Sequence, residues 1–402
     1  MKYAFLTTLI PKQMEDDMCR LSKNNMQDAA NALQWHIFDG LCENYETEIK
    51  IFNVLPIGSF PQYYLKPFVK QTTFSTDNSE KNINIGFCNV KFFRKLHQPK
   101  RIYKQLVKWC QSDSEEKCLF VYTISAQFMT AVARVKKKYP NLKICAIIAD
   151  LPDMLNLSNK MSLAKRVFNQ KSASVAYANL DCIDAFVLLT KQMADYLHIS
   201  KPYVVMEGIS TQTEQILSRR EETGFKTILY SGTLHEKFGV LNLVRAFENI
   251  PHSNYRLLIC GVGDSEDKIK EAAAKDERIT FLGQLKREEV LRLQKEASVL
   301  VNPRQNNEEF TKYSFPSKNL EYLSSGIPFV AYKLDGIPDE YDEYINYVKD
   351  NSIESLRDIL INVCVDADGL ARKRADRAVC FVKNEKNAQK QTLKIKKMIE
   401  KL

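Results

Sequence analysis

The sequence contains no cysteines at metal-binding spacing. Its ten cysteines are scattered singly along 402 residues, without a Cys-x-x-Cys pair or a Cys/His cluster. Zinc sites draw their ligands from such clusters, so no metal ion is expected. Single free thiols, several of them inside apolar segments, are typical of proteins in a reducing cytosol. We therefore expect a cytoplasmic protein that works without a metal.

Long apolar stretches are also missing. No segment approaches the roughly 18 apolar residues that a membrane-spanning helix needs. The first apolar run, MKYAFLTTLI, is too short and too soon followed by charge to be a signal peptide. We expect a protein that is soluble, or held peripherally at the inner face of a membrane.

A strong excess of one charge and nucleic-acid motifs are absent as well. The net charge is +9, a modest excess that suits a nucleotide diphosphate or an acidic membrane surface. The sequence has no zinc-finger, helix-turn-helix or RRM signature. It also has no internal repeat and no low-complexity tract. Nucleic acid is therefore not an expected partner.

What the sequence has is globular composition and a regular alternation of elements. With 45% hydrophobic residues and 402 residues in all, the chain exceeds one ordinary core, so we expect two domains. Short apolar runs alternate with amphipathic helical patterns, which is typical of βαβ units and parallel sheets. In the first half we expect strands at residues 3–9, 118–122, 143–148, 185–189 and 203–206, and helices at 27–41 and 126–138.

The second half shows the same alternation. We expect strands at 227–230, 256–260, 279–281, 299–301 and 328–331, and helices at 241–249, 266–274, 287–297 and 317–325. Residues 207–225 are polar and lack a sustained apolar run, which favours a linker at 208–225 between domains at 1–207 and 226–383. A lysine-rich helix at 384–402 is expected to pack back on the body through Leu393, Ile395, Met398 and Ile399.

Two glycine turns follow strands in the second half. Residues 228–239 (ILYSGTLHEKFG) lead from a strand through a turn into a helix from about Val240. Backbone N–H groups and the helix dipole at such a turn favour phosphate, although a purely structural turn is about equally consistent with the pattern. Residues 259–264 (ICGVGD) repeat the pattern without the third glycine of a dinucleotide fingerprint. A tight turn with Asp264 as helix N-cap is the favoured interpretation there.

The third segment is the most informative. It comprises VNPR at residues 301–304, a polar loop, and YSFPSKNLEYLSSGIPFV at 313–330. Ser317 or Ser314 is expected to cap a helix, with Pro316 near its first turn and Gly326 at its end. The amino end of this helix suits a diphosphate, and Glu321, one turn deeper, suits the paired hydroxyls of a ribose.

Taken together, these segments resemble the donor domain of a GT-B-fold retaining glycosyltransferase of the family-four, group 1 type. The resemblance is carried in order by YSGTLHEKFGV, LLICGVGD, ITFLGQL, VNPR and YSFPSKNLEYLSSGIPFV, and covers about residues 226–350. It implies an α/β chain with two Rossmann-like domains facing each other across a cleft. A sugar-nucleotide epimerase of the same fold and a non-catalytic nucleotide-binding subunit remain alternatives.

The resemblance also implies the reaction partners. The donor is a nucleotide sugar, such as a UDP- or GDP-sugar, held by the C-terminal domain without a metal. The acceptor is a glycan or lipid-linked glycan on the N-terminal domain, in surface polysaccharide or glycolipid synthesis. Two or three cations are needed to stabilise the departing nucleotide diphosphate.

The family motif assigns roles to individual residues. Glu321 matches the second acid of the Glu-x7-Glu motif and is implied to hold the donor ribose. The first acid falls at Tyr313, a departure that leaves Glu308 or Glu309 as substitutes for the sugar contact. Donor-binding residues implied by the resemblance are Gly232, Thr233, Gly261, Gly263, Leu282, Gly283, Tyr313, Ser314, Phe315, Pro316, Ser317 and Glu321.

The catalytic cations also depart from the family pattern. The usual basic residue after the Ser-Gly turn falls at Thr233. Lys237 matches the lysine that follows it, and Arg304 and Lys318 are implied to restore the missing charge. Taken singly, each of these cations is equally consistent with a solvated surface charge.

Two features of the first half bear on the acceptor. The buried strand at 147–149 ends in Asp150, which resembles the position where related enzymes place a polar residue beside the reacting sugar. Asp150 is expected either to accept the acceptor proton or to cap a turn. The run at 91–101 (KFFRKLHQPKR) mixes cations with aromatic residues. It suits anionic lipid headgroups or a lipid-linked acceptor, although the pattern slightly favours a solvated amphipathic face.

Overall fold

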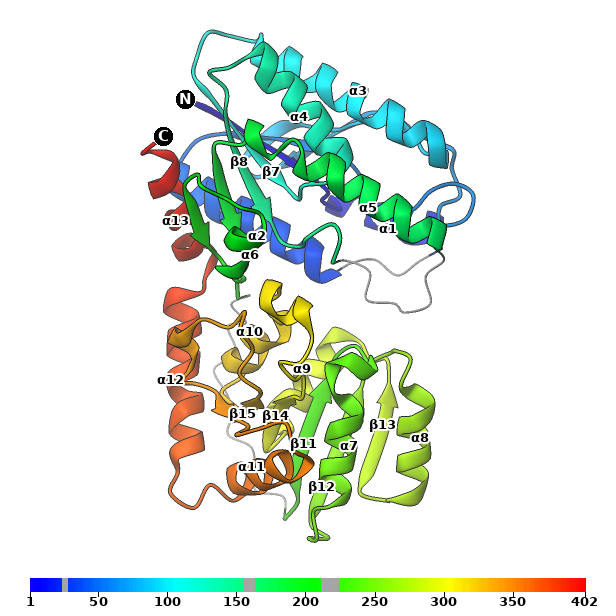
Figure 1. Cartoon of the computed structure of the whole chain (residues 1–402), viewed down its shortest axis with the longest axis vertical. Helices are drawn as coiled ribbons and strands as arrows, with labels where there is room; N and C mark the ends of the chain where they lie inside the picture. Colours follow the sequence, from blue (N-terminus) through cyan, green and yellow to red (C-terminus); the bar gives the residue numbers. More distant parts are fainter. Residues whose placement is uncertain (24–27, 155–162, 211–223) are drawn as a thin grey trace. The chain divides into compact units, whose positions relative to one another are not determined.

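The computed structural model describes residues 1–23, 28–154, 163–210 and 224–402 (Figure 1). The chain forms two compact units, residues Met1–Ile209 with Ala388–Leu402, and residues Ser210–Asn387. Both units are α/β with largely parallel sheets, so the predicted fold class of two Rossmann-like domains is confirmed. Most of the predicted linker, residues 211–223, lies outside the described residues. Within the described part of the chain, no helix is both long and apolar enough to cross a bilayer.

The N-terminal unit contains an eight-stranded sheet in the order β10-β9-β8-β7-β1-β2-β5-β4. Its neighbouring strands are parallel except for β4 and β5. The central strands β7 and β8 are apolar and buried almost throughout, as a sheet covered on both faces requires. The strands are β1 (Lys2–Thr7), β2 (Ile49–Asn53), β4 (Thr72–Thr76), β5 (Ser79–Asn84), β7 (Lys117–Tyr122), β8 (Lys143–Ile148), β9 (Ala185–Leu188) and β10 (Tyr203–Val205), with β3 (Phe68–Val69) and β6 (Phe87–Cys88) forming a separate antiparallel ribbon.

Helices cover both faces of this sheet. The last helix of the chain packs against α2 over a core that includes Phe5, Phe120 and Ile395, and α3, α4 and α5 lie side by side on the other face (Figure 1). The five strands expected in this half and both expected helices are confirmed, whereas β2, β4 and β5 were not expected. The helices are α1 (Glu15–Leu21), α2 (Asp28–Tyr45), α3 (Lys91–Cys110), α4 (Ala126–Lys138), α5 (Leu163–Tyr177) and α6 (Gln192–Tyr196), with 3₁₀ turns at Lys12–Met14 and Leu180–Cys182.

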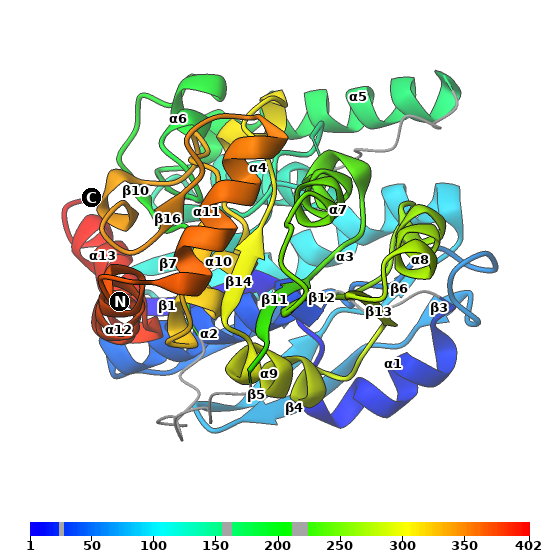
Figure 2. The same cartoon turned by 90° about the horizontal axis from the view of Figure 1, so that it is seen from below.

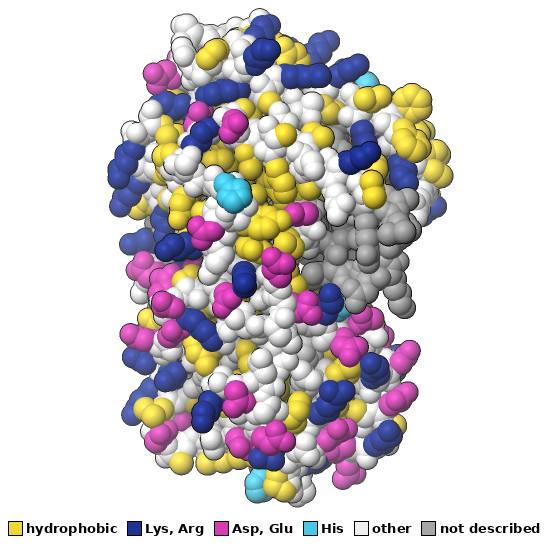
Figure 3. Space-filling model, in the orientation of Figure 1, with side chains coloured by type: hydrophobic (Ala, Val, Ile, Leu, Met, Phe, Trp, Pro, Cys, Tyr) yellow, Lys and Arg dark blue, Asp and Glu magenta, His cyan; other side chains and the backbone are white. Residues whose placement is uncertain are grey.

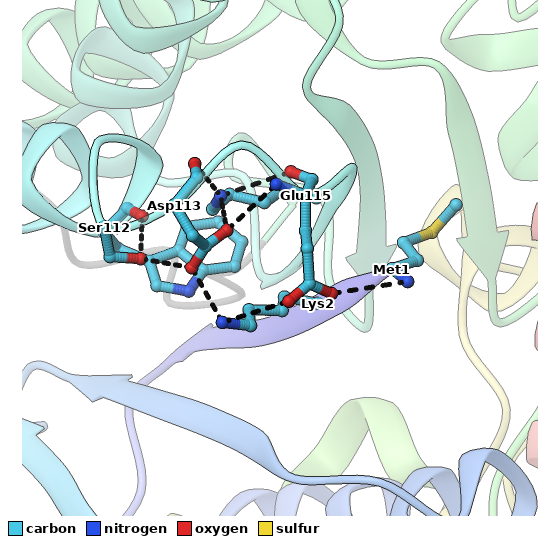
Figure 4. A network of polar contacts seen from close by, with 7 residues as sticks. Met1, Lys2, Ser112, Asp113 and Glu115 are labelled. Atoms are coloured by element: carbon cyan, nitrogen blue, oxygen red, sulfur yellow. Dashed lines mark hydrogen bonds and ion pairs between the residues drawn. The ribbon is translucent and has the colours of Figure 1, made fainter.

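Charge pairs join the amino ends of β1 and β7. The loop after α3 places Asp113 2.7 Å from Lys2 Nζ and 2.6 Å from Lys117 Nζ (Figure 4). Glu115 adds a second contact to Lys2, at 3.3 Å. Hydrogen bonds from Lys117, Lys2 and Ser112 hold the pKa of the Asp113 carboxyl well below its usual value. The acids nearest to α3 in sequence are therefore engaged at the carboxyl end of that helix.

The C-terminal unit contains a six-stranded parallel sheet in the order β13-β12-β11-β14-β15-β16 (Figure 2). All five strands and all four helices expected between residues 226 and 331 are confirmed, with ends shifted by one or two residues. The strands are β11 (Lys226–Ser231), β12 (Tyr255–Cys260), β13 (Ile279–Gly283), β14 (Val299–Asn302), β15 (Phe329–Ala331) and β16 (Asn346–Tyr347). The helices are α7 (Val240–Glu248), α8 (Glu266–Lys275), α9 (Arg287–Glu296), α10 (Ser317–Ser324), α11 (Ile353–Val365) and α12 (Leu370–Glu385), with 3₁₀ turns η3 (Glu236–Phe238), η4 (Glu309–Tyr313) and η5 (Asp339–Tyr341).

The chain returns to the N-terminal unit through a break after α12. The predicted helix at 384–402 begins only at Ala388, as α13 (Ala388–Ile399). Just before it, Lys386 is buried, its Nζ lies 2.5 Å from Glu340, and it sits over the rings of Tyr341 and Phe381. Ile395 and Met398 of α13 are buried against the N-terminal unit, as the apolar stripe predicts.

Candidate functional site

The carboxyl ends of β11, β12 and β13 meet at one edge of the sheet, where their turns pack backbone to backbone. Gly261 has φ of +141° and donates its N–H to the carbonyl of Gly283 at 2.8 Å. A Cβ at Gly261 would lie 1.8 Å from the carbonyl oxygen of Gly232, and one at Gly263 would lie 2.3 Å from that of Leu234. Glycine is thus required for the predicted donor-binding turns to touch.

A fourth strand end joins this edge through Gly239. That residue has φ of +79°, and a Cβ on it would lie 2.0 Å from the carbonyl oxygen of Pro303. Helix α7 begins directly after it at Val240, as predicted. The segment after β11 therefore packs backbone to backbone against the segment after β14, at Pro303 and next to Arg304.

Helix α10 begins at Ser317 as predicted, but the expected cap is wrong. Its N-cap is Pro316, and no side chain caps the helix. The Ser314 hydroxyl instead donates to the carbonyl of Phe310 at 3.1 Å. Because no side chain occupies the helix start, its first N–H groups stay available to an anion.

Phe315 also differs from expectation. Its side chain lies in the hydrophobic core against Tyr341, with ring centroids 5.2 Å apart. It therefore supports the start of α10 from beneath, and only its backbone is left for donor contact. Pro316 is buried beside it, whereas Ser317 is exposed.

The Glu321 carboxylate receives three donors from two helices. Oε1 accepts from Lys318 Nζ at 2.7 Å and from Gln294 Nε2 at 2.6 Å, and Oε2 accepts from Arg287 at 3.3 Å. Burial by itself raises the pKa of the Glu321 carboxyl, but the Lys318 ammonium and the Gln294 amide outweigh it, so this pKa lies below its usual value. Glu321 is thus an ionised hydrogen-bond acceptor, held in place by Lys318 and Gln294 beside the carboxyl ends of the strands.

A buried polar network behind Glu321 was not predicted. Gln294 Nε2 also donates to the hydroxyl of Ser231 at 3.2 Å. The Tyr322 hydroxyl accepts the N–H of Ser231 at 2.9 Å and donates to its carbonyl at 3.1 Å. All three residues are buried. They fix α9 and α10 to the end of β11, and nothing in the sequence distinguishes them from other helix and strand polar residues.

Arg304 packs against two aromatic rings, Phe238 and Phe310, which also contact each other with centroids 6.2 Å apart. Its guanidinium carbon is 4.1 Å from the ring centroid of Phe238 and 5.6 Å from that of Phe310. Burial lowers the pKa of Arg304 to about 10. Its buried Nε has no hydrogen-bond partner, and none of the ion pairs among the described residues involves it. A half-buried guanidinium without a carboxylate partner attracts an anionic ligand.

The remaining predicted donor residues surround these two clusters. Lys237 Nζ lies 3.7 Å from Glu308, one of the suggested substitutes for the missing motif acid, while Glu309 opens η4, which ends at Tyr313. Thr233 is exposed, and its carbonyl accepts the Tyr230 hydroxyl at 2.8 Å.

The turns after β12 and β13 complete the edge. The N-cap of α8 is Ser265, so the expected capping role of Asp264 is wrong. Asp264 instead accepts the Glu236 N–H at 3.2 Å and lies 3.4 Å from His235 Nε2, which ties its turn to η3. Leu282 and Gly283 are half-buried at the end of β13.

Asp150 lies in the N-terminal unit, directly after β8. The residue is exposed, yet the surrounding protein desolvates its carboxyl and raises the pKa to about 6. Three residues on, Asp153 accepts hydrogen bonds from Tyr177 and Tyr196. No side-chain capping bond from Asp150 is found among the described contacts.

The comparisons with known proteins agree with this geometry. Residues 211–379 match the model of the family described as glycosyl transferases group 1. No curated protein sequence matches the chain. A sucrose-phosphate synthase from Thermosynechococcus elongatus has a similar solved structure, with a TM-score of 0.64, 13% identity, and 100% of this chain and 99% of that chain covered.

Two further solved structures are similar over nearly the whole chain. For a lipopolysaccharide outer core galactosyltransferase, WaaB, the TM-score is 0.58 with 16% identity, covering 96% of this chain and 99% of that one. For S. aureus TarM, solved as a mutant with fondaparinux, alpha-GlcNAc-glycerol and UDP, the TM-score is 0.55 with 11% identity and 99% of both chains covered. At these identities the likeness establishes the GT-B fold.

Proposed function

We propose that this chain, whose residues 211–379 match the model of group 1 glycosyl transferases, transfers a sugar from a nucleotide-diphosphate sugar with retention of configuration. One observation carries the proposal. A single sheet edge brings together an uncapped helix start, an ionised acceptor at Glu321 and a half-buried Arg304 whose Nε has no hydrogen-bond partner. Those are the groups that a diphosphate attached to a ribose requires.

Each donor group has a place at this edge. The first N–H groups of α10 and the Arg304 guanidinium take the diphosphate, with Lys237 and Lys318 adding charge. Glu321 takes the ribose hydroxyls, which requires it to give up only the contact to exposed Arg287. Leu282 and Gly283 face the base. As the glycosidic bond breaks, negative charge grows on the diphosphate, so these cations stabilise the transition state more than the bound donor.

The acceptor belongs to the N-terminal unit in this proposal. We place a glycan or lipid-linked glycan beside Asp150, whose carboxylate accepts or orients the proton of the attacking hydroxyl. The attack comes on the face from which the diphosphate leaves, and no protein nucleophile is assigned. Surface polysaccharide or glycolipid synthesis at the cytoplasmic face of a membrane is the process that fits such an acceptor.

Lys318→Ala is expected to lower kcat roughly tenfold, the low end for a charge-assisted hydrogen bond, while donor affinity changes less. The reason is that Lys318 acts most strongly on charge that develops as the donor breaks. Steady-state kinetics with donor binding by calorimetry checks this. Arg287→Ala is the matched control, because that cation is mostly exposed and its 3.3 Å contact to Glu321 contributes little. An equal loss in kcat and affinity contradicts the leaving-group role.

Activity is expected to rise with pH through about 6, because the Asp150 carboxyl has a pKa of about 6 and accepts a proton only when ionised. Below that pH the protonated carboxyl cannot act. A profile of kcat/KM against pH checks the prediction. In Asp150→Asn the rate falls and this rise disappears, whereas Asp153→Asn keeps it. A profile for Asp150→Asn that still rises through the same pH excludes Asp150 as the titrating group.

The reaction class is tested with the purified full chain and a panel of nucleotide sugars, with and without lipid-linked glycans. Nucleotide release that depends on acceptor, with the product retaining the anomeric configuration of the donor, is the expected result. An isomerised donor would establish an epimerase. Donor binding without turnover under every condition would establish an accessory subunit.

A further inference from the structure

The face of the N-terminal unit formed by α3, α4 and α5 carries charge of one sign. Helix α3 contains seven Lys and Arg residues, α4 four and α5 three, and none of the three helices contains Asp or Glu. Helices α1 and α2 are the reverse, with three acids each and a single Arg between them. The basic excess of the protein is therefore segregated onto one helical layer.

Most of these cations are free of acidic partners. In the described part of the chain, the layer forms one ion pair, between Lys136 of α4 and Asp184. Arg94 and Arg101 of α3 are engaged by backbone carbonyls. The exposed cations left at the surface are Lys91, Lys100, Lys104, Lys108, Arg134, Lys137, Lys138 and Lys171. Such a surface is complementary to an extended negative charge rather than to a single anion.

The amino end of α3 presents bare hydrophobic side chains beside these cations. Phe92, Phe93 and Leu96 are 74%, 65% and 69% exposed. Packing within the protein therefore does not explain these apolar side chains, and exposed apolar patches of this kind mark interaction sites. Phe92, Leu96, Lys100, Lys104 and Lys108 follow one another at intervals of four, so each neighbours the next and together they form a row that winds across the exposed side of the helix. On the opposite face, Ile102, Leu106 and Trp109 are buried, and the Trp109 ring packs against Phe52 of β2.

Two other segments extend this apolar tip. Phe68 of β3, 65% exposed, is paired with Cys88 of β6, whose N–H donates to His97 of α3 at 3.1 Å. Phe168 of α5, 39% exposed, holds Lys95 of α3 over its ring, with 3.0 Å from Nζ to the ring centroid. Yellow and dark-blue side chains mix at this end of the unit in the space-filling view (Figure 3). We call Phe68, Phe92, Phe93, Leu96 and Phe168 the aromatic tip.

We infer that the α3–α5 face docks on an anionic lipid bilayer, with the aromatic tip inserted at the level of the headgroups and the lysine row lying against them. Each cation near such a surface raises the binding constant about fivefold. The apolar side chains strengthen binding further because their surface is removed from water when they insert. This inference specifies the surface behind the proposed membrane-facing process, but it does not depend on donor turnover.

Vesicle sedimentation with the full chain tests the inference. The probes are vesicles of phosphatidylcholine and vesicles of equal parts phosphatidylcholine and phosphatidylglycerol. We expect binding to the second only, weakening as salt rises. Phe92→Ser with Phe93→Ser should lower the partition coefficient at least about tenfold. The control pair, Val365→Ser with Leu370→Ser, removes two exposed apolar side chains, 56% and 54% exposed, from the other unit and should bind as wild type.

Two matched charge-reversal variants test the electrostatic part of the inference. Lys100→Glu with Lys104→Glu should reduce binding at least about tenfold, whereas Lys275→Glu with Lys373→Glu, the same charge change in the other unit, should reduce it much less. Equal binding to both vesicle types, or equal effects of the matched pairs, overturns the inference. So does a wild-type dimer that Phe92→Ser with Phe93→Ser dissociates, because the tip would then face a second copy. Donor turnover measured without vesicles separates failure here from failure of the proposed transferase activity.

Discussion

Glu321→Ala is expected to weaken binding of the nucleotide-sugar donor by about 1.5–3 kcal/mol, or roughly 10- to 150-fold in Kd. The substitution removes an ionised acceptor that Lys318 and Gln294 hold at 2.7 and 2.6 Å. Because Gln294 is buried, its amide also loses a partner that water cannot easily replace. Both effects fall on the same sheet edge, so this variant should be the most damaging at the donor site.

Isothermal titration of UDP, GDP and their sugars onto the full chain checks this loss. Glu296→Ala is the control, since that glutamate is exposed on α9 and forms an ion pair with exposed Arg292, away from Glu321. Glu321→Gln separates charge from shape, because it keeps a side chain for Gln294 to contact. A folded Glu321→Ala protein with unchanged donor affinity would exclude the ribose role.

Gly261→Ala is expected to destabilise the C-terminal unit by more than about 3 kcal/mol. The added methyl group would stand 1.8 Å from the carbonyl oxygen of Gly232, and φ of +141° is a conformation that alanine avoids. Relief requires the turns after β11 and β12 to separate, which also breaks the donor edge. Thermal unfolding together with donor affinity measures both consequences.

Gly283→Ala is the matched control for this effect. Gly283 also has a positive φ, +68°, but no atom lies within 4 Å of the position that its Cβ would take. The cost there should be only the backbone term, about 1–2 kcal/mol. Equal destabilisation by the two substitutions would show that close packing of the turns is not what Gly261 provides.

Much of the fold follows from local sequence pattern. The strands β7, β8, β11 and β14 are short apolar runs between polar turns, and each was predicted to within two residues because burial on both faces leaves no other pattern. The edge strand β4 and its neighbour β5 were missed because their sequences are polar and their alternation is weak. The break at Lys386 was missed because it depends on distant partners, namely Glu340 and the ring of Tyr341.

Less of the candidate site could be predicted from sequence, because several of its contacts also join residues that are distant along the chain. The glycine turns and the start of α10 are local features and could be read directly. The environment of Arg304 depends on η3 and η4 bringing the adjacent rings of Phe238 and Phe310 against it. Likewise, Gln294 becomes important only because α9 packs beside α10 at the end of β11. The roles assigned to Asp150, Lys237, Arg304 and Lys318 stay predictions.

The most direct measurement is a crystal structure of the full chain with the nucleoside diphosphate that it binds most tightly. The account predicts the diphosphate at the start of α10, hydrogen-bonded to its first N–H groups with Arg304 and Lys318 in contact, and the ribose hydroxyls on Glu321. A nucleotide bound elsewhere, out of contact with both Arg304 and Glu321, would contradict it.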